Sequence, residues 1–189
     1  MLKANFITAQ EAAEKIQDGS TLCTIGMTLV SASESILKAI EKRFETVGHP
    51  ADITLVHSCG QSDRKDGIQH LAHEGLVKRI VGSHWGLQPR WMEMIANSQV
   101  EAYCLPQGQI AQLYRSMACG LPGKMSKVGL GTFIDPRVEG GKMNDRTKPL
   151  PDIVDILEYG GEEYMFYKEI PLDTVLIRGT VCDEMGNLT

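Results

Sequence analysis

The chain has 189 residues, of which 42% are hydrophobic and 23% charged, and its net charge is −5. A chain of this length can bury a core without disulfides or metals, and its acidity disfavours nucleic acid as a partner, because phosphate binding requires a basic face. No apolar run approaches the roughly 18 residues of a membrane span.

The first quarter of the chain predicts helix, strand and helix in turn. Residues 8–17 open with a capping box formed by Thr8 and Glu11, and residues 20–26 form a short apolar strand. A second capping box, Ser31 with Glu34, predicts a helix that ends at Gly48. Helical spacing gives this second helix a buried stripe of Ile36, Leu37, Ile40 and Phe44.

The middle of the chain continues the alternation. Strands are predicted over residues 52–58, 77–85 and 99–105, with a short helix at 68–75 and a helix at 88–97 that has Pro89 near its first position. Strands that alternate with helices at this pace indicate an open, mostly parallel sheet with helices on both faces. The predicted fold class is therefore α/β.

The last third has a different character. Residues 121–152 are rich in glycine and proline and show little periodicity, and residues 153–170 predict a β-hairpin around Gly160 and Gly161, an appendage to the sheet. Residues 173–189 predict a strand followed by a turn at Glu184–Asn187. Because that strand has no return strand to cover its edge, we expect residues 1–189 to be one incomplete domain of a longer protein.

Targeting signals and metal motifs are not recognisable in the sequence. The amino-terminus lacks a signal-peptide core and a transit-peptide composition, which favours the cytoplasm. No C-x-x-C motif occurs, so the cysteines are expected to be reduced thiols: Cys23, Cys59, Cys104, Cys119 and Cys182. His70 and His73 lie three residues apart without a third ligand at suitable spacing, so we interpret them as partly exposed polar residues and predict no metal site.

The stretch Pro106-Gln107-Gly108 stands where a predicted strand meets a helix. In open α/β sheets ligands bind beyond the carboxyl ends of the strands, and a helix start presents free N–H groups that favour an oxyanion. Gly108 would allow a ligand close to the backbone, and the Gln107 amide could stabilise negative charge on a carbonyl oxygen. The alternative is a turn whose glutamine faces water.

The region around this stretch resembles the hallmark region of family I coenzyme A transferases. Its residues match the P-Q-G motif, an alanine and an arginine in the following helix, G-x-P and G-x-G-T, and they are Pro106, Gln107, Gly108, Ala111, Arg115, Gly120, Pro122, Gly129, Gly131 and Thr132. The extension at residues 133–144 is closer to the acetate/propionate CoA-transferase branch. The resemblance runs over essentially the whole chain and implies its amino-terminal part.

The resemblance implies an acyl-CoA:carboxylate CoA-transferase that moves CoA between short-chain carboxylic acids through a glutamyl-CoA thioester. Gln107 takes the role of an oxyanion donor, and Gly26, Ser58, Gly108, Gly129, Gly131 and Thr132 are the implied substrate-binding residues. Coenzyme A is then a substrate, and no resident cofactor is implied. The implied partners are acyl-CoA, a carboxylate, the rest of the enzyme and further copies in a homo-oligomer.

The nucleophilic glutamate of the family is expected outside this chain. Its Glu-x-Gly context belongs to the second half of the family, whereas Glu74 and Glu139, the two glutamates followed by glycine here, match other parts of the pattern. The chain alone is accordingly expected to be inactive. The early glycine-rich loop of the family is also replaced, with only Gly26 recognisable, and Ser58 stands where the family has an asparagine.

Two other functions use the same kind of sheet. A sugar-phosphate isomerase would need an acid/base pair near these loops, and the one cluster of that kind is Asp63, Lys65 and Asp66, which a solvated loop also explains. A ligand-sensing domain would bind without covalent chemistry. The glycines at 129 and 131 likewise fit either a substrate-facing loop or a connector that needs positive φ.

Overall fold

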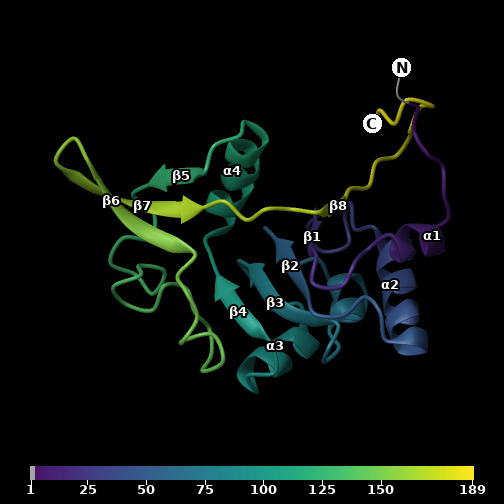
Figure 1. Cartoon of the computed structure of the whole chain (residues 1–189), viewed down its shortest axis with the longest axis horizontal. Helices are drawn as coiled ribbons and strands as arrows, with labels where there is room; N and C mark the ends of the chain where they lie inside the picture. The colour runs from purple at the N-terminus through teal and green to yellow at the C-terminus, as the bar shows by residue number, and fades with distance from the viewer. Residues whose placement is uncertain (1–2) are drawn as a thin grey trace.

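A computed structural model describes residues 3–189 (Figure 1). Five strands form the main sheet in the order β4-β3-β2-β1-β8, and all neighbouring pairs are parallel. They are β1 (Thr21–Thr24), β2 (Ile53–His57), β3 (Val77–Gly82), β4 (Glu101–Cys104) and β8 (Thr174–Leu176). The prediction of an open parallel α/β sheet is confirmed.

Alternate residues of the strands pack into two separate cores. Leu22, Leu55 and Ile80 face one cluster, whereas their neighbours Cys23, Val56 and Val81 face the other, as the period of a strand requires. The first cluster is covered by α1 (Ala9–Glu14), α2 (Glu34–Val47), the 3-10 helix η1 (Gly67–Leu71) and α3 (Pro89–Ala96). The second is covered by α4 (Gln107–Ala118) and a small sheet.

The small sheet is antiparallel, in the order β5-β7-β6. Its strands are β5 (Gly123–Ser126), β6 (Val154–Tyr159) and β7 (Glu162–Lys168). The predicted hairpin is confirmed as β6 and β7, but β5 was not predicted. Val154, Met165 and Tyr167 are buried in the second core, so the hairpin is an integral layer of the fold rather than a free appendage.

The irregular segment 127–153 protects the outer edge of β4. Met143 N donates to Ala102 O over 2.9 Å, and Ala102 N donates to the Thr147 hydroxyl over 2.8 Å. The Asn144 amide donates to the carbonyls of Ile95 and Val100 at 2.9 Å each. The segment therefore satisfies backbone groups that an edge strand would otherwise leave open.

Local predictions for the helices were partly wrong. The capping box of Thr8 and Glu11 is present, although α1 ends earlier than predicted, at Glu14. The second box is absent: Ser33 is the N-cap of α2 without a side-chain hydrogen bond, and Ser31 has φ 63°. The predicted stripe of α2 packs in the first core. In α4, Ala118 is exposed, while Ile110 and Leu113 are buried.

The remaining features concern the sheet edge, the thiols and the membrane. Among the described residues, β8 pairs only with β1, which leaves its other side as the open edge that the sequence predicted. All five cysteines are free thiols. Within residues 3–189, none of the helices combines the length and the apolar character needed to span a bilayer.

Candidate active site at the carboxyl edge of the main sheet

The carboxyl ends of the parallel strands lie at one edge of the main sheet, where the arrowheads of β2, β3 and β4 point in Figure 1. Three residues predicted from the sequence follow these ends: Gly26 after β1, Ser58 directly after β2 and Gln107 after β4. We call this side of the sheet the carboxyl edge. It is the usual position of a ligand site in open α/β sheets.

Gln107 is the first residue of α4 and is exposed. The N-cap Pro106 has extended backbone angles (φ −60°, ψ 130°), so the chain turns from β4 into the helix at this residue. The first N–H groups of a helix have no partners within the helix and carry the positive end of its dipole. Gln107 therefore presents an amide beside a helix start that favours negative charge.

Gly108 has no internal reason to be a glycine. Its φ is not positive, and a Cβ atom at this position would meet nothing within 4 Å. Gly26 is different, because it has φ +150° and its Cβ would lie 2.7 Å from Val30 O. Packing within the chain thus explains Gly26 but leaves open space above Gly108.

Two further loops lie at this edge, after β1 and β2. Edge loop 1 comprises residues 25–33 and edge loop 2 comprises residues 58–66. Thr28 N donates to Gly60 O over 3.1 Å, and the Gln61 amide donates to Thr24 O over 2.7 Å. The carbonyl of Ser58 accepts a hydrogen bond from the Ser83 hydroxyl, which connects edge loop 2 to the end of β3. Gly26 and Ser58 thus lie in loops that are joined directly.

Buried polar atoms without hydrogen-bond partners gather beneath this edge. In the described part of the chain they include Thr24 Oγ1, His57 Nε2, Gln61 Oε1, Trp85 Nε1 and both amide atoms of Gln88. Gln88 and His57 are fully buried. Unpaired buried polar groups are uncommon in folded proteins, and these belong to strand ends or to loops that follow strands at the carboxyl edge. These residues were not predicted from the sequence, although a polar residue at the end of an apolar strand run is a signal that could have identified some of them.

His57 is held as a neutral imidazole. Burial lowers the pKa of His57 to about 4, and nearby His84 lowers it further against the opposing hydrogen bond with Cys59 O. The Nδ1 atom lies 2.9 Å from that carbonyl and must donate to it, so Nε2 is an acceptor. Gly82 makes room for the ring, since a Cβ there would lie 2.5 Å from Nε2.

The glycine-containing loop at residues 127–135 lies after β5 rather than directly after a strand of the main sheet. Gly129 and Gly131 have φ values of 100° and 69°, which accounts for glycine at both positions. Among the hydrogen bonds of the loop, Thr132 Oγ1 donates to Gly129 O within it, and the Tyr167 hydroxyl of β7 donates to Val128 O. These contacts fit the connector interpretation.

Asp135 organises this loop. Its side chain is 1% exposed and accepts hydrogen bonds from Gly131 N at 2.9 Å and from the Arg137 guanidinium at 2.8 and 3.0 Å. The hydrogen bonds from Arg137 outweigh burial and hold the pKa of Asp135 well below its usual range. The carboxylate is therefore a charged centre around which residues 131–137 fold.

Replacing Asp135 by Asn should lower the free energy of unfolding by about 1.5–3 kcal/mol at pH 7, because charged hydrogen bonds are lost. A depressed pKa gives stability that is present above the ordinary value of about 3.9 and is lost as pH falls. Urea denaturation should thus show a constant difference in the free energy of unfolding between wild type and variant near neutral pH. This difference should become smaller below about pH 4. An unchanged difference in the free energy of unfolding at about pH 2 would contradict the proposal that the charge of Asp135 stabilises the loop.

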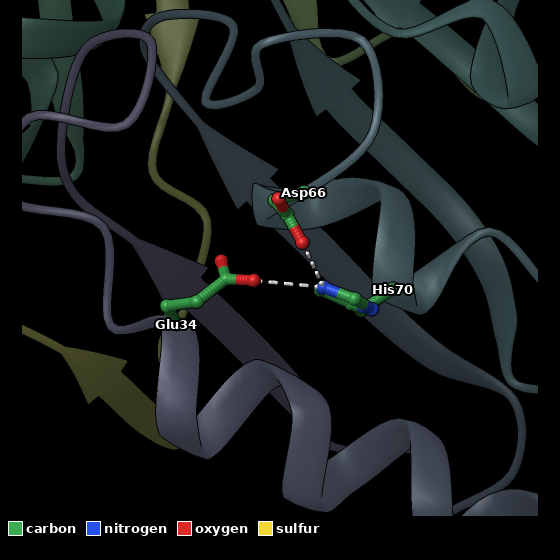
Figure 2. A group of neighbouring side chains, drawn as sticks. All are labelled: Glu34, Asp66 and His70. Atoms are coloured by element: carbon green, nitrogen blue, oxygen red, sulfur yellow. Dashed lines mark hydrogen bonds and ion pairs between the residues drawn. The ribbon is translucent and has the colours of Figure 1, made fainter.

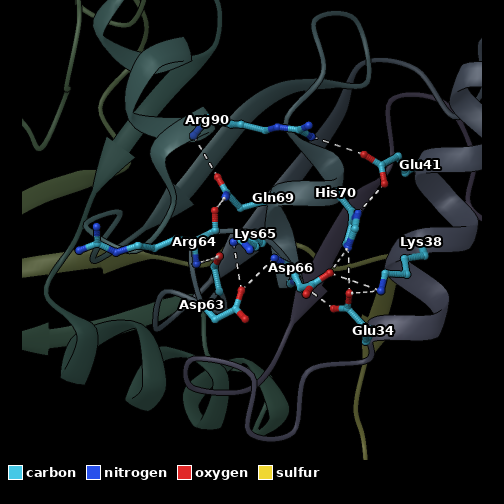
Figure 3. A network of polar contacts seen from close by, with 12 residues as sticks. Glu34, Lys38, Glu41, Asp63, Arg64, Lys65, Asp66, Gln69, His70 and Arg90 are labelled. Atoms are coloured by element: carbon cyan, nitrogen blue, oxygen red, sulfur yellow. Dashed lines mark hydrogen bonds and ion pairs between the residues drawn. The ribbon is translucent and has the colours of Figure 1, made fainter.

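A polar network joins the end of edge loop 2 to α2, η1 and α3 (Figure 3). Asp63 accepts hydrogen bonds from Lys65 N and Asp66 N, both 3.0 Å, and Lys38 pairs with Asp66 at 3.3 Å. This is a capped turn of a solvated loop, as the sequence suggested. Its carboxylates are thus engaged by backbone N–H groups and by Lys38.

His70 and His73 are half-buried, and both bind carboxylates of α2, which the sequence did not predict. Figure 2 shows the His70 ring beside Glu34 and Asp66. The Lys38 ammonium lies 3.1 Å from Glu34 and 3.3 Å from Asp66, so it pairs with the same two carboxylates that the His70 ring contacts. An ionic network accounts for the group without a metal ion.

An open parallel sheet with an exposed amide, a helix start and two polar loops at its carboxyl edge has the construction of ligand-binding α/β domains. The chain belongs to the coenzyme A transferase family, whose family model matches residues 6–189. The resemblance predicted from the P-Q-G region is thereby confirmed.

Three known proteins illustrate the similarity. Caffeate CoA-transferase of Acetobacterium woodii is 43% identical over 187 residues, which are 98% of this chain and 35% of that protein. Acetate CoA-transferase YdiF of Escherichia coli K12 is 38% identical over 185 residues, 97% of this chain and 34% of that one. The crystal structure of the acyl-CoA transferase YdiF apoenzyme of Escherichia coli O157:H7 has a TM-score of 0.94 at 35% identity, over 99% of this chain and 36% of that one.

The chain thus spans about a third of the length of these relatives. The similarity covers both sheets of the fold and places the chain within an acyl-CoA-handling family. An isomerase or a ligand sensor is not favoured by this assignment.

Proposed function

We propose that residues 1–189 are the amino-terminal domain of an acyl-CoA:carboxylate CoA-transferase that moves CoA between short-chain carboxylic acids. The family assignment and the names of the relatives support this function. The observation that carries it is the exposed Gln107 amide at the first residue of α4, beyond the carboxyl end of β4. A cytoplasmic location, where acyl-CoA is available, is part of the proposal.

The proposed reaction proceeds by exchange of acyl groups. A glutamate carboxylate attacks the thioester carbonyl of acyl-CoA, the C–S bond breaks, and the CoA thiolate leaves an acyl-glutamyl anhydride. The thiolate then attacks the glutamyl carbonyl and releases the first carboxylate, which gives a glutamyl-CoA thioester. The acceptor carboxylate reacts with this thioester by the reverse steps. Coenzyme A serves as a substrate throughout.

The contribution of this chain is electrostatic. Each attack places negative charge on a carbonyl oxygen, and an oriented donor stabilises that charge more than it stabilises the neutral carbonyl. Gln107 would supply the amide N–H, and the start of α4 would add its dipole. The open space above Gly108 would allow the reacting carbonyl to approach this backbone.

The nucleophilic glutamate is proposed to lie outside this chain. Glu74 is exposed and precedes β3, at the opposite edge of the sheet from Gln107. Glu139 is exposed in the segment that covers β4. The remaining part of the enzyme would therefore face the carboxyl edge and complete the site, and the chain alone is proposed to lack turnover. Assembly into a homo-oligomer is part of the same proposal.

Intact mass spectrometry of the complete protein tests this function. Incubation with a short-chain acyl-CoA should add the mass of CoA less one water, the signature of a glutamyl-CoA thioester, and hydroxylamine should remove it. A protein that binds acyl-CoA without this adduct would be a sensor. A protein that neither binds acyl-CoA nor forms the adduct would contradict the proposal altogether.

Gly108→Ala separates binding from folding. Because the position is helical and open, alanine should raise the free energy of unfolding by about 0.4–1 kcal/mol. The added methyl group should nevertheless raise the KM for acyl-CoA about tenfold if the substrate approaches here, which corresponds to about 1.4 kcal/mol. Thermal unfolding and steady-state kinetics of the complete enzyme provide both measurements. Unchanged kinetics would place the substrate elsewhere.

A further inference from the structure

His70 lies between two carboxylates of the same helix. Its Nε2 atom is 2.8 Å from Oε1 of Glu34, and its Nδ1 atom binds Oε2 of Glu41, two turns farther along α2 (Figure 3). The His70 side chain is 13% exposed, so these contacts are largely shielded from water. The ring thus bridges η1 to α2 at two points.

The geometry fixes the charge of the ring. Carboxylate oxygens accept hydrogen bonds, and a neutral imidazole has only one N–H to donate, whereas the imidazolium has two. Both ring nitrogens of His70 contact carboxyl groups, so when both of these groups are ionised, only the charged ring satisfies both contacts. A neutral ring would direct one lone pair at a carboxylate.

The surroundings balance this charge. Three carboxylates gather around the ring, and Lys38 from α2 and Arg90 from α3 are the other cations that contact them. His73 Nε2 also binds Glu41, at 2.9 Å. When His70 is charged, the three negative charges of Glu34, Glu41 and Asp66 are matched by three positive charges, on Lys38, His70 and Arg90.

The bridge continues to the carboxyl edge. Glu34 also accepts a hydrogen bond from Gly67 N at 2.9 Å, which fixes the start of η1. Ile68 N donates to Gln61 O at 2.8 Å, and the Gln61 amide in turn donates to Thr24 O. Because α2 begins directly after edge loop 1, the two edge loops are fastened to each other through η1 and α2.

We propose that His70 is a positioning residue, whose charged ring fastens η1 along α2 and thereby holds edge loops 1 and 2 together at the carboxyl edge. The expected effect of His70 on activity rests on the proposed transferase function, since Gly26 and Ser58 lie in these loops. The expected effect of His70 on the structure of the loops is independent of that function.

The pKa of His70 predicts how the bridge depends on pH. Burial lowers the pKa of His70, but the hydrogen bonds and charges of Glu41 and Glu34 outweigh burial and raise it above the ordinary value. A raised pKa means that the bridge is fully formed below about pH 6.5 and is lost as pH rises through the value in the folded protein. The edge loops should therefore loosen on the alkaline side.

The test uses the complete protein with His70→Gln, Glu41→Gln and a control, His49→Gln. His49 is an exposed histidine that binds a single carboxylate, Asp18, at 2.8 Å, far from η1 in the sequence. Exchange of the imidazole C2 hydrogen, followed by mass spectrometry, gives the pKa of each histidine. Amide hydrogen exchange reports the opening of residues 25–33 and 58–66, and kcat is measured against pH.

We expect the pKa of His70 to exceed the ordinary histidine value of about 6.5 and to fall in Glu41→Gln. Amide exchange of both edge loops should rise about tenfold in His70→Gln, but not in His49→Gln. Wild-type kcat should decline as His70 loses its proton, whereas His70→Gln should start about tenfold lower and lack that decline.

A pKa of His70 at or below the ordinary value of about 6.5, or unchanged loop exchange in His70→Gln, would overturn the proposal. If His70→Gln does not fold, the pKa of His70 and the amide exchange of the edge loops are measured in Glu41→Gln instead. An unchanged pKa or unchanged loop exchange in that variant would overturn the proposal. Absence of transferase activity in the wild type would overturn the proposed function alone, because pKa and amide exchange are read without turnover.

Discussion

Replacing Gln107 by alanine is expected to lower kcat of the complete enzyme by about 10²–10³, which corresponds to about 3–4 kcal/mol of transition-state stabilisation. The amide would donate to an oxygen that is fully charged only during the reaction, so KM should change little. Because Gln107 is exposed at the start of α4, its loss creates no cavity, and the free energy of unfolding should stay within about 0.5 kcal/mol of wild type.

The matched control for this prediction is Gln112→Ala, the same substitution at another exposed position of α4. It tests whether loss of an amide from this helix affects catalysis in general. Steady-state kinetics with varied acyl-CoA and varied carboxylate give kcat and KM for both variants. Wild-type turnover in Gln107→Ala would remove the oxyanion role, and equal losses in both variants would show that the effect comes from the helix.

The sequence predicts the main sheet well because its strands carry a local signal. Short apolar runs that alternate with amphipathic helices require a parallel sheet, and the strand at residues 53–57 ends where the apolar run gives way to His57 and Ser58. The P-Q-G motif likewise fixes Gln107 at a strand-to-helix corner. Local sequence therefore places the residues of the carboxyl edge, although not the contacts between them.

Long-range contacts explain the failures. Ser31 and Glu34 have the spacing of a capping box, as Thr8 and Glu11 do, but the Glu34 carboxylate binds Gly67 N and His70, which come from a distant segment. A tertiary partner thus replaced the local one. Strand β5 depends in the same way on pairing with β7, 39 or more residues farther along the chain, since Ser126 pairs with Met165.

The polar network around His70 could not be read from spacing alone. Histidines three residues apart indicate one helical turn, but nothing in their spacing shows that Glu34 and Glu41 face them from α2. The two glutamates are seven residues apart, which places them on one face of a helix. That spacing becomes informative only once η1 is known to pack against that face.

Replacing Trp91 by alanine is expected to lower the free energy of unfolding by about 3–5 kcal/mol, the range for truncation of a large buried aromatic residue. Trp91 is completely buried in the first core, and its indole Nε1 donates to Ile68 O over 2.9 Å. The substitution therefore creates a cavity and also leaves a buried carbonyl without its donor. Urea denaturation of the complete protein measures the change.

Met92→Ala is the control, because Met92 follows Trp91 in α3 and is 52% exposed. It should change the free energy of unfolding by no more than about 0.5 kcal/mol. Since Ile68 lies in η1, two residues from His70, the cavity in Trp91→Ala should also speed amide exchange of η1 at denaturant concentrations where the sheet is still protected. Equal stability losses in the two variants would mean that α3 is not anchored through Trp91, and the support of η1 from that side would have to come from Arg90 and Gln69 alone.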